Sequence, residues 1–358
     1  MLEAEGENYI VINLITIIQT LTNIGRIVLL ILEFNIIVVQ STVFIFSLIQ
    51  TLYIMVYIKK HYRWIDLSFE PNYNAVSQKG SVLIHQVSGL IFNNTDIVIL
   101  SLFTNLKIVS VYTLYNMIFT VLKNAMNYIS NGVSFALGQL YANNQKLFLE
   151  YYELYELYYT SLAFSLSSVL FVCTIPFMKL YTAGINDINY IDKGISILFT
   201  LIILLLVGRT PSRQTIDIAG HFRNTQKQAI VESMLNLTVT LALVTRYGIY
   251  GVLIGTIVAL LYRFNDMIRY ANKILLRRSP WATYKMWLLN FGVFSLFYVL
   301  FSYIEIEINS YIKLIGFAII CFIISGSVFF VINSILFKDS FINLVALIRS
   351  YLNSNRKL

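Results

Sequence analysis

Long apolar runs dominate the chain and are separated by short polar connections. Each run is close to 20 residues long and none alternates with a period of two, so each predicts a membrane-spanning helix rather than a barrel strand. The pattern therefore predicts an all-α, polytopic membrane helix bundle with about ten transmembrane helices. These spans are expected near residues 9–32, 35–58, 81–103, 110–138, 159–181, 189–208, 226–245, 248–268, 286–304 and 312–337.

One predicted span, residues 80–103, carries a carboxylate deep inside an apolar sequence. His85, Gly89, Asn93 and Asp96 recur at helical spacing and share one face, whereas Val, Leu, Ile and Phe fill the other. A charge at membrane depth costs at least ~2.5 kcal/mol unless it is protonated, paired or hydrated. This span is therefore predicted to have one wet side.

Composition supports a membrane protein and excludes several other classes. The chain of 358 residues is 58% hydrophobic and only 12% charged, which leaves no room for a sizeable soluble domain. Its net charge of +8 is attributed to basic loops, and no nucleic-acid partner is expected. The two cysteines, Cys173 and Cys321, lie in apolar segments and predict neither a disulfide framework nor a metal site.

The basic residues indicate how the spans are oriented. Most of the 26 Lys and Arg residues lie at the termini and in every second loop counted from the N-terminus. The positive-inside rule then places both termini in the cytoplasm. The longest polar connection, residues 59–80, contains Pro71 and is predicted to be a cytoplasmic linker between two lobes.

Two regions of the chain show a weak internal repeat. The segments that begin at Leu2 and Ile216 both have an acidic residue, an alanine and a glycine, and then a helix with an asparagine in mid-span, Asn23 or Asn236. The alternative is that any two membrane hairpins look somewhat alike. If the repeat is real, the second copy follows four helices and the first copy follows none, so about four N-terminal helices are expected to be missing.

Three strings carry a family resemblance: AEGENYIVINLIT (4–16), NNTDIVILSLF (93–103) and AIVESMLNLTVTLALVTRYGIYGVLIGTIVALLYR (229–263). They resemble the polysaccharide-transport branch of the multidrug/oligosaccharidyl-lipid/polysaccharide exporter superfamily, the Wzx-type O-antigen and capsule-unit flippases. The resemblance runs through all the predicted helices. It implies two six-helix bundles that rock between inward-open and outward-open states, of which this chain has a partial set matching the family's fifth to fourteenth helices.

The resemblance also implies a function, partners and a division of the chain. It implies flipping of undecaprenyl-diphosphate-linked oligosaccharide across the bacterial cytoplasmic membrane, with protons or sodium as coupling ions and other polysaccharide-assembly proteins as further partners. Membrane lipids would surround the bundle. The expected division is 1–58 for the last two helices of the N-terminal lobe, 59–80 for the linker, 81–270 for the six-helix C-terminal lobe and 271–358 for two extra helices with a basic tail.

Polar residues at membrane depth are the candidates for the transport path. A diphosphate head needs a wet, cationic cavity, and asparagine side chains suit sugar hydroxyls. The alternative for such residues is hydrogen bonding between helices. The predicted substrate-cavity residues are Arg26, Asn93, Lys123, Asn127, Asn131, Arg209, Arg213 and Asn236, and the predicted ion-coupling residues are Asp96 and Glu232.

Three of these expectations have explicit alternatives. Asp96 and Lys123 lie on consecutive helices, so they either neutralise each other or act separately on the ion and the diphosphate. Arg209 and Arg213 form one helical face with Asp217 if the helix continues past Pro211, and this face either captures the diphosphate or only anchors the protein. Glu232 lies about two turns into its helix, where it either extends toward the cytoplasmic interface, pairs with Arg209 or Arg213, or couples to ions.

Other functions fit the sequence less well than flipping. The sequence lacks a glycine-rich phosphate loop, HExxH, GxSxG and a His/Cys cluster, so neither an enzyme nor a cofactor is expected. A drug/cation antiporter of the same superfamily would favour acidic and aromatic cavity residues. A membrane-embedded glycan polymerase would need a large non-cytoplasmic loop. The segment EYYELYELYY (150–159) is interpreted as an interfacial lead into the next helix.

Overall fold

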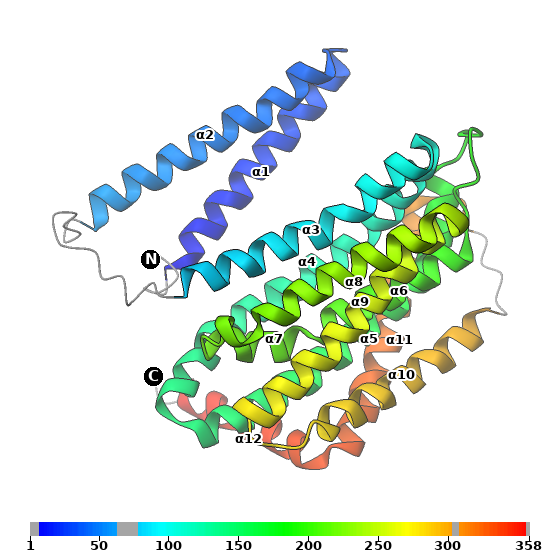
Figure 1. Cartoon of the computed structure of the whole chain (residues 1–358). Coiled ribbons are helices and arrows are strands. Elements are labelled where there is room, and N and C mark those ends of the chain that lie inside the picture. Colours follow the sequence, from blue (N-terminus) through cyan, green and yellow to red (C-terminus); the bar gives the residue numbers. More distant parts are fainter. Residues whose placement is uncertain (1–6, 63–77, 303–307, 356–358) are drawn as a thin grey trace. The chain divides into compact units, whose positions relative to one another are not determined.

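The computed structural model describes residues 7–62, 78–302 and 308–355, and within these ranges all of the regular secondary structure is helical (Figure 1). Ten of the described helical segments are long and apolar enough to cross a membrane. The predicted all-α, multi-pass helix bundle is therefore confirmed.

The chain forms two compact units, residues 1–76 and residues 77–358. The first unit contains the hairpin of α1 (Asn8–Ile31) and α2 (Ile36–His61). Asn35 begins α2, because its side chain accepts a hydrogen bond from the Ile37 backbone N–H at 3.2 Å. The division falls in the range expected to be a linker, but residues 63–77 of that linker lie outside the described residues.

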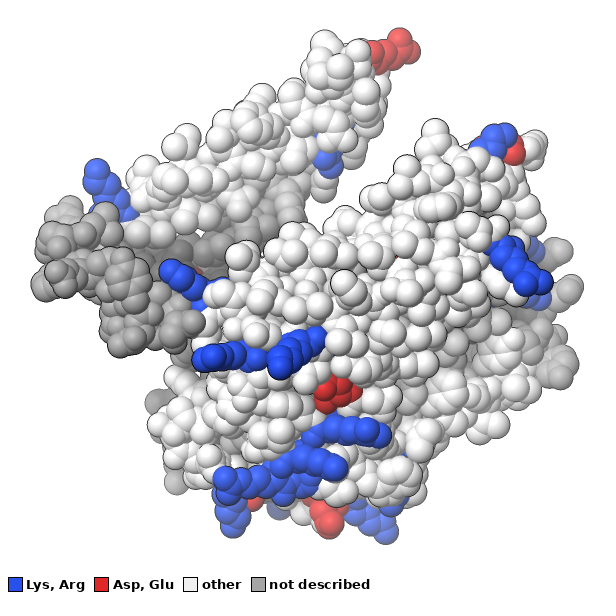
Figure 2. Space-filling view, viewed as in Figure 1, with Lys and Arg blue, Asp and Glu red and all other residues white. Residues whose placement is uncertain are grey.

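The second unit is a bundle of long helices with short connections (Figure 1). Figure 2 shows a broad uncharged middle, with Lys and Arg gathered toward the end of this unit where α9 ends and α12 lies. This distribution is typical of a membrane bundle. The unit contains α3 (Lys79–Phe103), α4 (Leu106–Asn143), α5 (Gln145–Tyr181), α6 (Lys193–Gly208), α7 (Thr210–Ile218), α8 (Phe222–Tyr247), α9 (Ile249–Tyr270), the π-helical turn η1 (Ala271–Leu275), α10 (Trp281–Ser302), α11 (Tyr311–Leu336) and α12 (Lys338–Asn355).

Helix α5 is longer than predicted, and helix α12 is additional to the predicted spans. Helix α5 begins at Gln145, after Asn144 caps it by accepting from the Leu147 N–H at 3.1 Å, so the segment 150–159 belongs to the helix itself. Tyr152 in this segment is buried rather than lying at headgroup level. The residues of α12 fall in the range predicted to be a basic tail, so this helix corrects that prediction.

The long span near residues 193–218 is broken into two helices. Helix α6 ends at Gly208, and α7 begins at Thr210 with Pro211 in its first turn, where a missing backbone N–H costs nothing. Gly208 is required at the break, because a Cβ there would lie 2.5 Å from the Trp287 Nε1 atom of α10.

Buried polar side chains hold the last long helices on α5. Asn290 of α10 and Asn333 of α11 are fully buried and exchange two amide hydrogen bonds of 3.1 and 2.8 Å. Ser165 of α5 and Ser325 of α11 lie 2.9 Å apart through their hydroxyl oxygens. Hydrogen bonds of this kind join helices inside an apolar bundle, so they fix α10 to α11 and α11 to α5.

The end of the unit at the α5–α6 connection is closed by hydrogen bonds. The Tyr115 hydroxyl donates to the Asp192 carbonyl at 3.0 Å and also accepts from the Asp192 N–H at 3.0 Å. The Asp192 carboxylate caps α6 and accepts from the Tyr250 hydroxyl at 2.7 Å. This end, which the charge pattern predicts to be non-cytoplasmic, is therefore tied together across α4, α6 and α9.

Candidate functional site

A charged cavity of about 530 Å³ lies inside the second unit, walled by α3, α4, α6, α7, α8 and α9. Its lining residues come from the first half of α3 and α8 and the last part of α6 and α9, so it lies in the half of the bundle nearest α7. Charge at this depth is unusual for a membrane bundle and marks a functional candidate. The titratable side chains on its wall are His85, Lys123, Arg209, Arg213, Asp217, Glu232 and Arg263.

The break between α6 and α7 positions part of this wall. Arg209 lies at the junction, and Arg213 and Asp217 follow one and two turns later along α7. All three line the charged cavity, and helical structure continues through Pro211 after the single turn residue Arg209. The opposite face of α7 is buried against the bundle, since Gln214 and Ser130 of α4 bond through two contacts of 2.8 and 3.2 Å.

Glu232 of α8 bridges two arginines at the edge of the cavity. Its Oε1 atom pairs with Arg209, and its Oε2 atom lies 3.5 Å from Nε of Arg263. Arg263 is only 2% exposed and also donates to Asp266 at 2.6 Å. The two arginines and two carboxylates balance in charge, which explains how a guanidinium can be buried at this depth.

Two other cations on the wall are not balanced in this way. Lys123 of α4 donates only a long 3.4 Å hydrogen bond to the Asn93 side chain of α3. Neither Lys123 nor Arg213 has a carboxylate within ion-pair distance among the described residues. Their charges are therefore available to an anionic ligand in the cavity.

Asp96 belongs to a separate polar cluster in the middle of the unit. Its Oδ2 atom accepts from the Tyr112 hydroxyl and from the Thr256 hydroxyl, each at 2.9 Å. The Thr256 hydroxyl accepts in turn from the Asn236 amide at 2.9 Å. These side chains come from α3, α4, α8 and α9, so one buried carboxylate ties four helices together.

The Asp96 cluster contains oxygen atoms that lack partners. Asp96 Oδ1 and Asn236 Oδ1 are buried without a hydrogen-bond partner in the described part of the chain, as is Thr240 Oγ1 one turn further along α8. Carboxylate, amide and hydroxyl oxygens suit a hard cation, and a carboxylate alone suits a proton. No group of three or more His, Cys, Asp or Glu side chains fit to hold a metal occurs in the described ranges. A cation here would therefore depend on the neutral oxygens.

A second cavity, of about 60 Å³, lies beside the Asp96 cluster. Asp96 and Thr256 line it, and it shares Asn93 and Lys123 with the wall of the charged cavity. This volume is enough for a few water molecules. Asp96 therefore faces polar space next to the charged cavity without forming an ion pair with Lys123.

The structure brings together most, but not all, of the predicted site residues. Asn236 is fully buried behind Asp96, and Asn131 is exposed and lines neither cavity. Arg26 lies in the first unit, where it donates to the Gln40 side chain at 3.3 Å. The predicted residues on the wall of the charged cavity are Asn93, Lys123, Asn127, Arg209, Arg213 and Glu232, and Asp96 lines the smaller cavity beside it.

Sequence reasoning missed several residues that shape the site. Arg263 is absent from the predicted site residues, as are Tyr112 and Thr256, the partners of Asp96. His85 does line the cavity, but its Nε2–H group donates to the Phe222 carbonyl at 2.9 Å, as expected for a residue between helices. A sequence signal existed for Arg263, because it lies four residues before Met267 on the buried stripe of α9.

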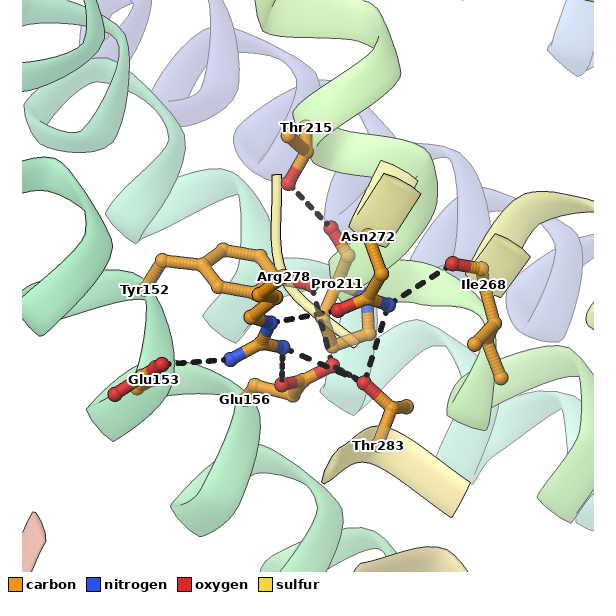
Figure 3. A network of polar contacts seen from close by, with 9 residues as sticks. All are labelled: Tyr152, Glu153, Glu156, Pro211, Thr215, Ile268, Asn272, Arg278 and Thr283. Carbon is orange, nitrogen blue, oxygen red and sulfur yellow. Dashed lines mark hydrogen bonds and ion pairs between the residues drawn. The ribbon is translucent and has the colours of Figure 1, made fainter. Parts of the chain in front are cut away.

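Arg278 is the centre of a network of polar contacts with α5, η1 and α10 (Figure 3). Arg278 follows η1 and pairs with Glu156 and, at 3.0 Å, with Glu153 of α5. Burial is the largest single effect and lowers the pKa of Arg278, but Glu156, Tyr152 and Glu153 together outweigh it and raise this pKa above its ordinary value. The guanidinium stays charged and fixes the α9–α10 connection to α5.

A comparison of the sequence with protein-family models finds no match, and neither does a comparison with curated proteins.

Proposed function

We propose that this protein flips lipid-linked oligosaccharides that carry a diphosphate across the bacterial cytoplasmic membrane, for the synthesis of surface polysaccharide. The observation that carries the proposal is the charged cavity, in which Lys123 and Arg213 have no carboxylate partner among the described residues. The cavity lies in the half of the bundle that the charge pattern predicts to face the cytoplasm, where such lipids are made.

The chemistry of the cavity suits a diphosphate attached to a sugar. Lys123, Arg209 and Arg213 offer charge-assisted donors to phosphate oxygens, and Asn93 and Asn127 offer amide groups to hydroxyls. A volume of about 530 Å³ falls within the usual range of ligand cavities. The polyprenyl tail needs no cavity, because it can remain in the surrounding lipid.

The excess of cations favours this cargo over the organic cations of a drug/cation antiporter. Among the wall residues, Glu232 is engaged by two arginines, and Asp217 is the other carboxylate. An organic cation would meet four basic side chains on this wall, Lys123, Arg209, Arg213 and Arg263, and one carboxylate, Asp217, that is not held in an ion pair. Like-charge contacts of this kind reject the wrong ligand strongly.

Asp96 is the group that we propose for ion coupling, with a proton or sodium ion as the coupling ion. Its unpartnered Oδ1 atom and the unpartnered oxygens of Asn236 and Thr240 would accept either ion. Because Asp96 ties α3, α4, α8 and α9, ion binding there would change how tightly these helices pack. Glu232 is a second candidate, since release from Arg209 would leave its carboxylate free to bind a proton.

A deletion strain tests the proposal in the cell. Loss of the protein should leave lipid-linked repeat units on the cytoplasmic face, where a membrane-impermeant glycan probe cannot reach them, and should remove the surface polysaccharide. The wild-type gene should restore both. Unchanged surface polysaccharide in the deletion strain would contradict the proposed function.

A further inference from the structure

A groove of about 410 Å³ runs along the last turns of α9 and the start of η1, separate from the two cavities described above. Its lining includes Tyr262, Asn265, Arg269 and Lys273, which recur at steps of three or four and so share one helix face. We propose that this groove binds the phosphate headgroup of an anionic membrane phospholipid. The proposal does not depend on the transported substrate.

The charges in the groove favour an anion. Arg269 and Lys273 are exposed and have no ion pair or hydrogen bond with any other described residue. Asp266 also lines the groove, but its carboxylate is held by Arg263 at 2.6 Å. The groove therefore presents two uncompensated cations one helical turn apart, a spacing that lets both reach the same phosphate.

The depth of the groove matches the level of lipid headgroups. The exposed stripe of α9 is apolar over its earlier turns, at Ile254, Val258 and Leu261, which are 37%, 37% and 45% exposed. It becomes polar at Asn265 and basic at Arg269. From Ile254 to Arg269 a helix rises about 22 Å, enough for an acyl chain to lie along the apolar part while the phosphate reaches the arginine.

The rest of the groove is built for the boundary between lipid and water. Tyr262 lies on the inner side of the basic pair, as tyrosines at membrane interfaces commonly do. The Asn265 side chain is fixed by the Tyr284 hydroxyl, which donates to it at 2.8 Å, and Tyr270 lies 2.8 Å from Nδ1 of His221 through its hydroxyl. These bonds hold the polar rim in place before any ligand arrives.

The gathering of Lys and Arg at the same end of the unit agrees with this assignment (Figure 2). Basic grooves on the cytoplasmic side of membrane proteins attract anionic headgroups, with each Lys or Arg strengthening binding about fivefold. A zwitterionic lipid lacks the net charge that would benefit from both groups. The groove should therefore discriminate by headgroup charge.

Native mass spectrometry of the full chain in detergent tests the inference directly. Phosphatidylglycerol and phosphatidylcholine with identical acyl chains are titrated against the wild type and against an Arg269→Gln, Lys273→Gln double variant. We expect phosphatidylglycerol to bind more tightly to the wild type and to lose about 30-fold in affinity in the double variant. Both positions are exposed, so the unfolding temperature should not change.

The matched control is an Arg223→Gln, Lys227→Gln variant on α8, which removes the same charge at the same spacing from exposed positions outside the groove. It should keep wild-type affinity for phosphatidylglycerol. Equal losses in both double variants, or equal binding of the two lipids, would overturn the inference. Displacement of phosphatidylglycerol by inorganic phosphate would reassign the groove to a free anion and would also overturn it.

Discussion

Lys123 and Asp96 line the same small cavity on neighbouring helices, yet they do not form an ion pair. The Lys123 ammonium donates to Asn93 at 3.4 Å, whereas the Asp96 carboxylate accepts from Tyr112 and Thr256. The Lys123 ammonium and the Asp96 Oδ1 atom therefore each have no oppositely charged partner among the described residues. This separation is the basis for assigning the anionic cargo to one and the coupling ion to the other.

Exchange of the two charges is the first prediction. An Asp96→Lys, Lys123→Asp variant should be inactive, because the structure contains no ion pair between these residues that the exchange could restore. The new lysine would face the Tyr112 hydroxyl and the new aspartate the Asn93 side chain. Surface polysaccharide in the complemented deletion strain is the readout, with membrane abundance checked in parallel. Recovery of activity by the exchange would mean that the two groups serve only to neutralise each other.

Thr256 should contribute to stability through Asp96. Thr256→Val keeps the shape but removes the donor to Asp96 and the acceptor for Asn236, and should cost about 1–3 kcal/mol of unfolding free energy. The measurement is thermal unfolding of the purified protein in detergent. Thr238→Val, on an exposed position of α8, is the control and should have little effect. Equal unfolding temperatures for both variants would argue against the cluster.

The helices could be predicted from the sequence because each span is an apolar run of sufficient length. The ten predicted spans match the ten described segments, with the main error at α5, which begins well before residue 159. The tyrosines and glutamates of the segment 150–159 are typical of a segment at the membrane–water interface, which is why the sequence predicts a later start for this helix. In the structure Tyr152 and Glu156 are buried because Arg278, more than a hundred residues later, supplies the matching charge.

Arg278 should be essential to the fold, whereas its neighbour should not. Arg278→Gln leaves Glu156 buried without its counter-charge and should cost about 3–5 kcal/mol, while Arg277→Gln, at an exposed position, should be nearly neutral. Adding Glu156→Gln to Arg278→Gln should restore part of the loss. Since the pKa of Arg278 is raised, its contribution should stay constant through neutral and mildly alkaline pH.

Thermal unfolding at several pH values checks this network. Equal stability of the Arg277 and Arg278 variants would contradict the assigned role, as would a loss of the difference between them on going from neutral to mildly alkaline pH.

The break between α6 and α7 should be sensitive to one methyl group. Gly208→Ala places a Cβ against Trp287 and Phe264, and the shift needed should cost about 1–3 kcal/mol. Gly138→Ala on α4 meets nothing within 4 Å and should be neutral or slightly stabilising, as alanine favours a helix. Unfolding temperatures distinguish the two. A neutral Gly208→Ala would show that the contact with Trp287 is loose.

The candidate site could be predicted in part. Polar stripes at helical spacing identified Lys123, Asn127, Arg209, Arg213 and Glu232, which the structure places on one wall. Periodicity gives the face of a helix, but it does not tell which helices meet. The hydrogen-bond partners of Asp96 and the ion pairs of Glu232 depend on packing between distant segments, so they could not be predicted from spacing along the chain.

The central claim is that the cations of the charged cavity carry a diphosphate-linked sugar across the membrane. The purified full chain, reconstituted into liposomes, tests it with a fluorescent polyprenyl-diphosphate oligosaccharide and a membrane-impermeant quencher that reports headgroups on the outer surface. We predict that the wild type and a Lys146→Ala control, exposed at the start of α5, speed transfer between leaflets equally. A Lys123→Ala, Arg213→Ala variant should be slower by about 10- to 100-fold while remaining folded. Equal rates for that variant and the wild type, or no transfer by folded wild type, would contradict the account.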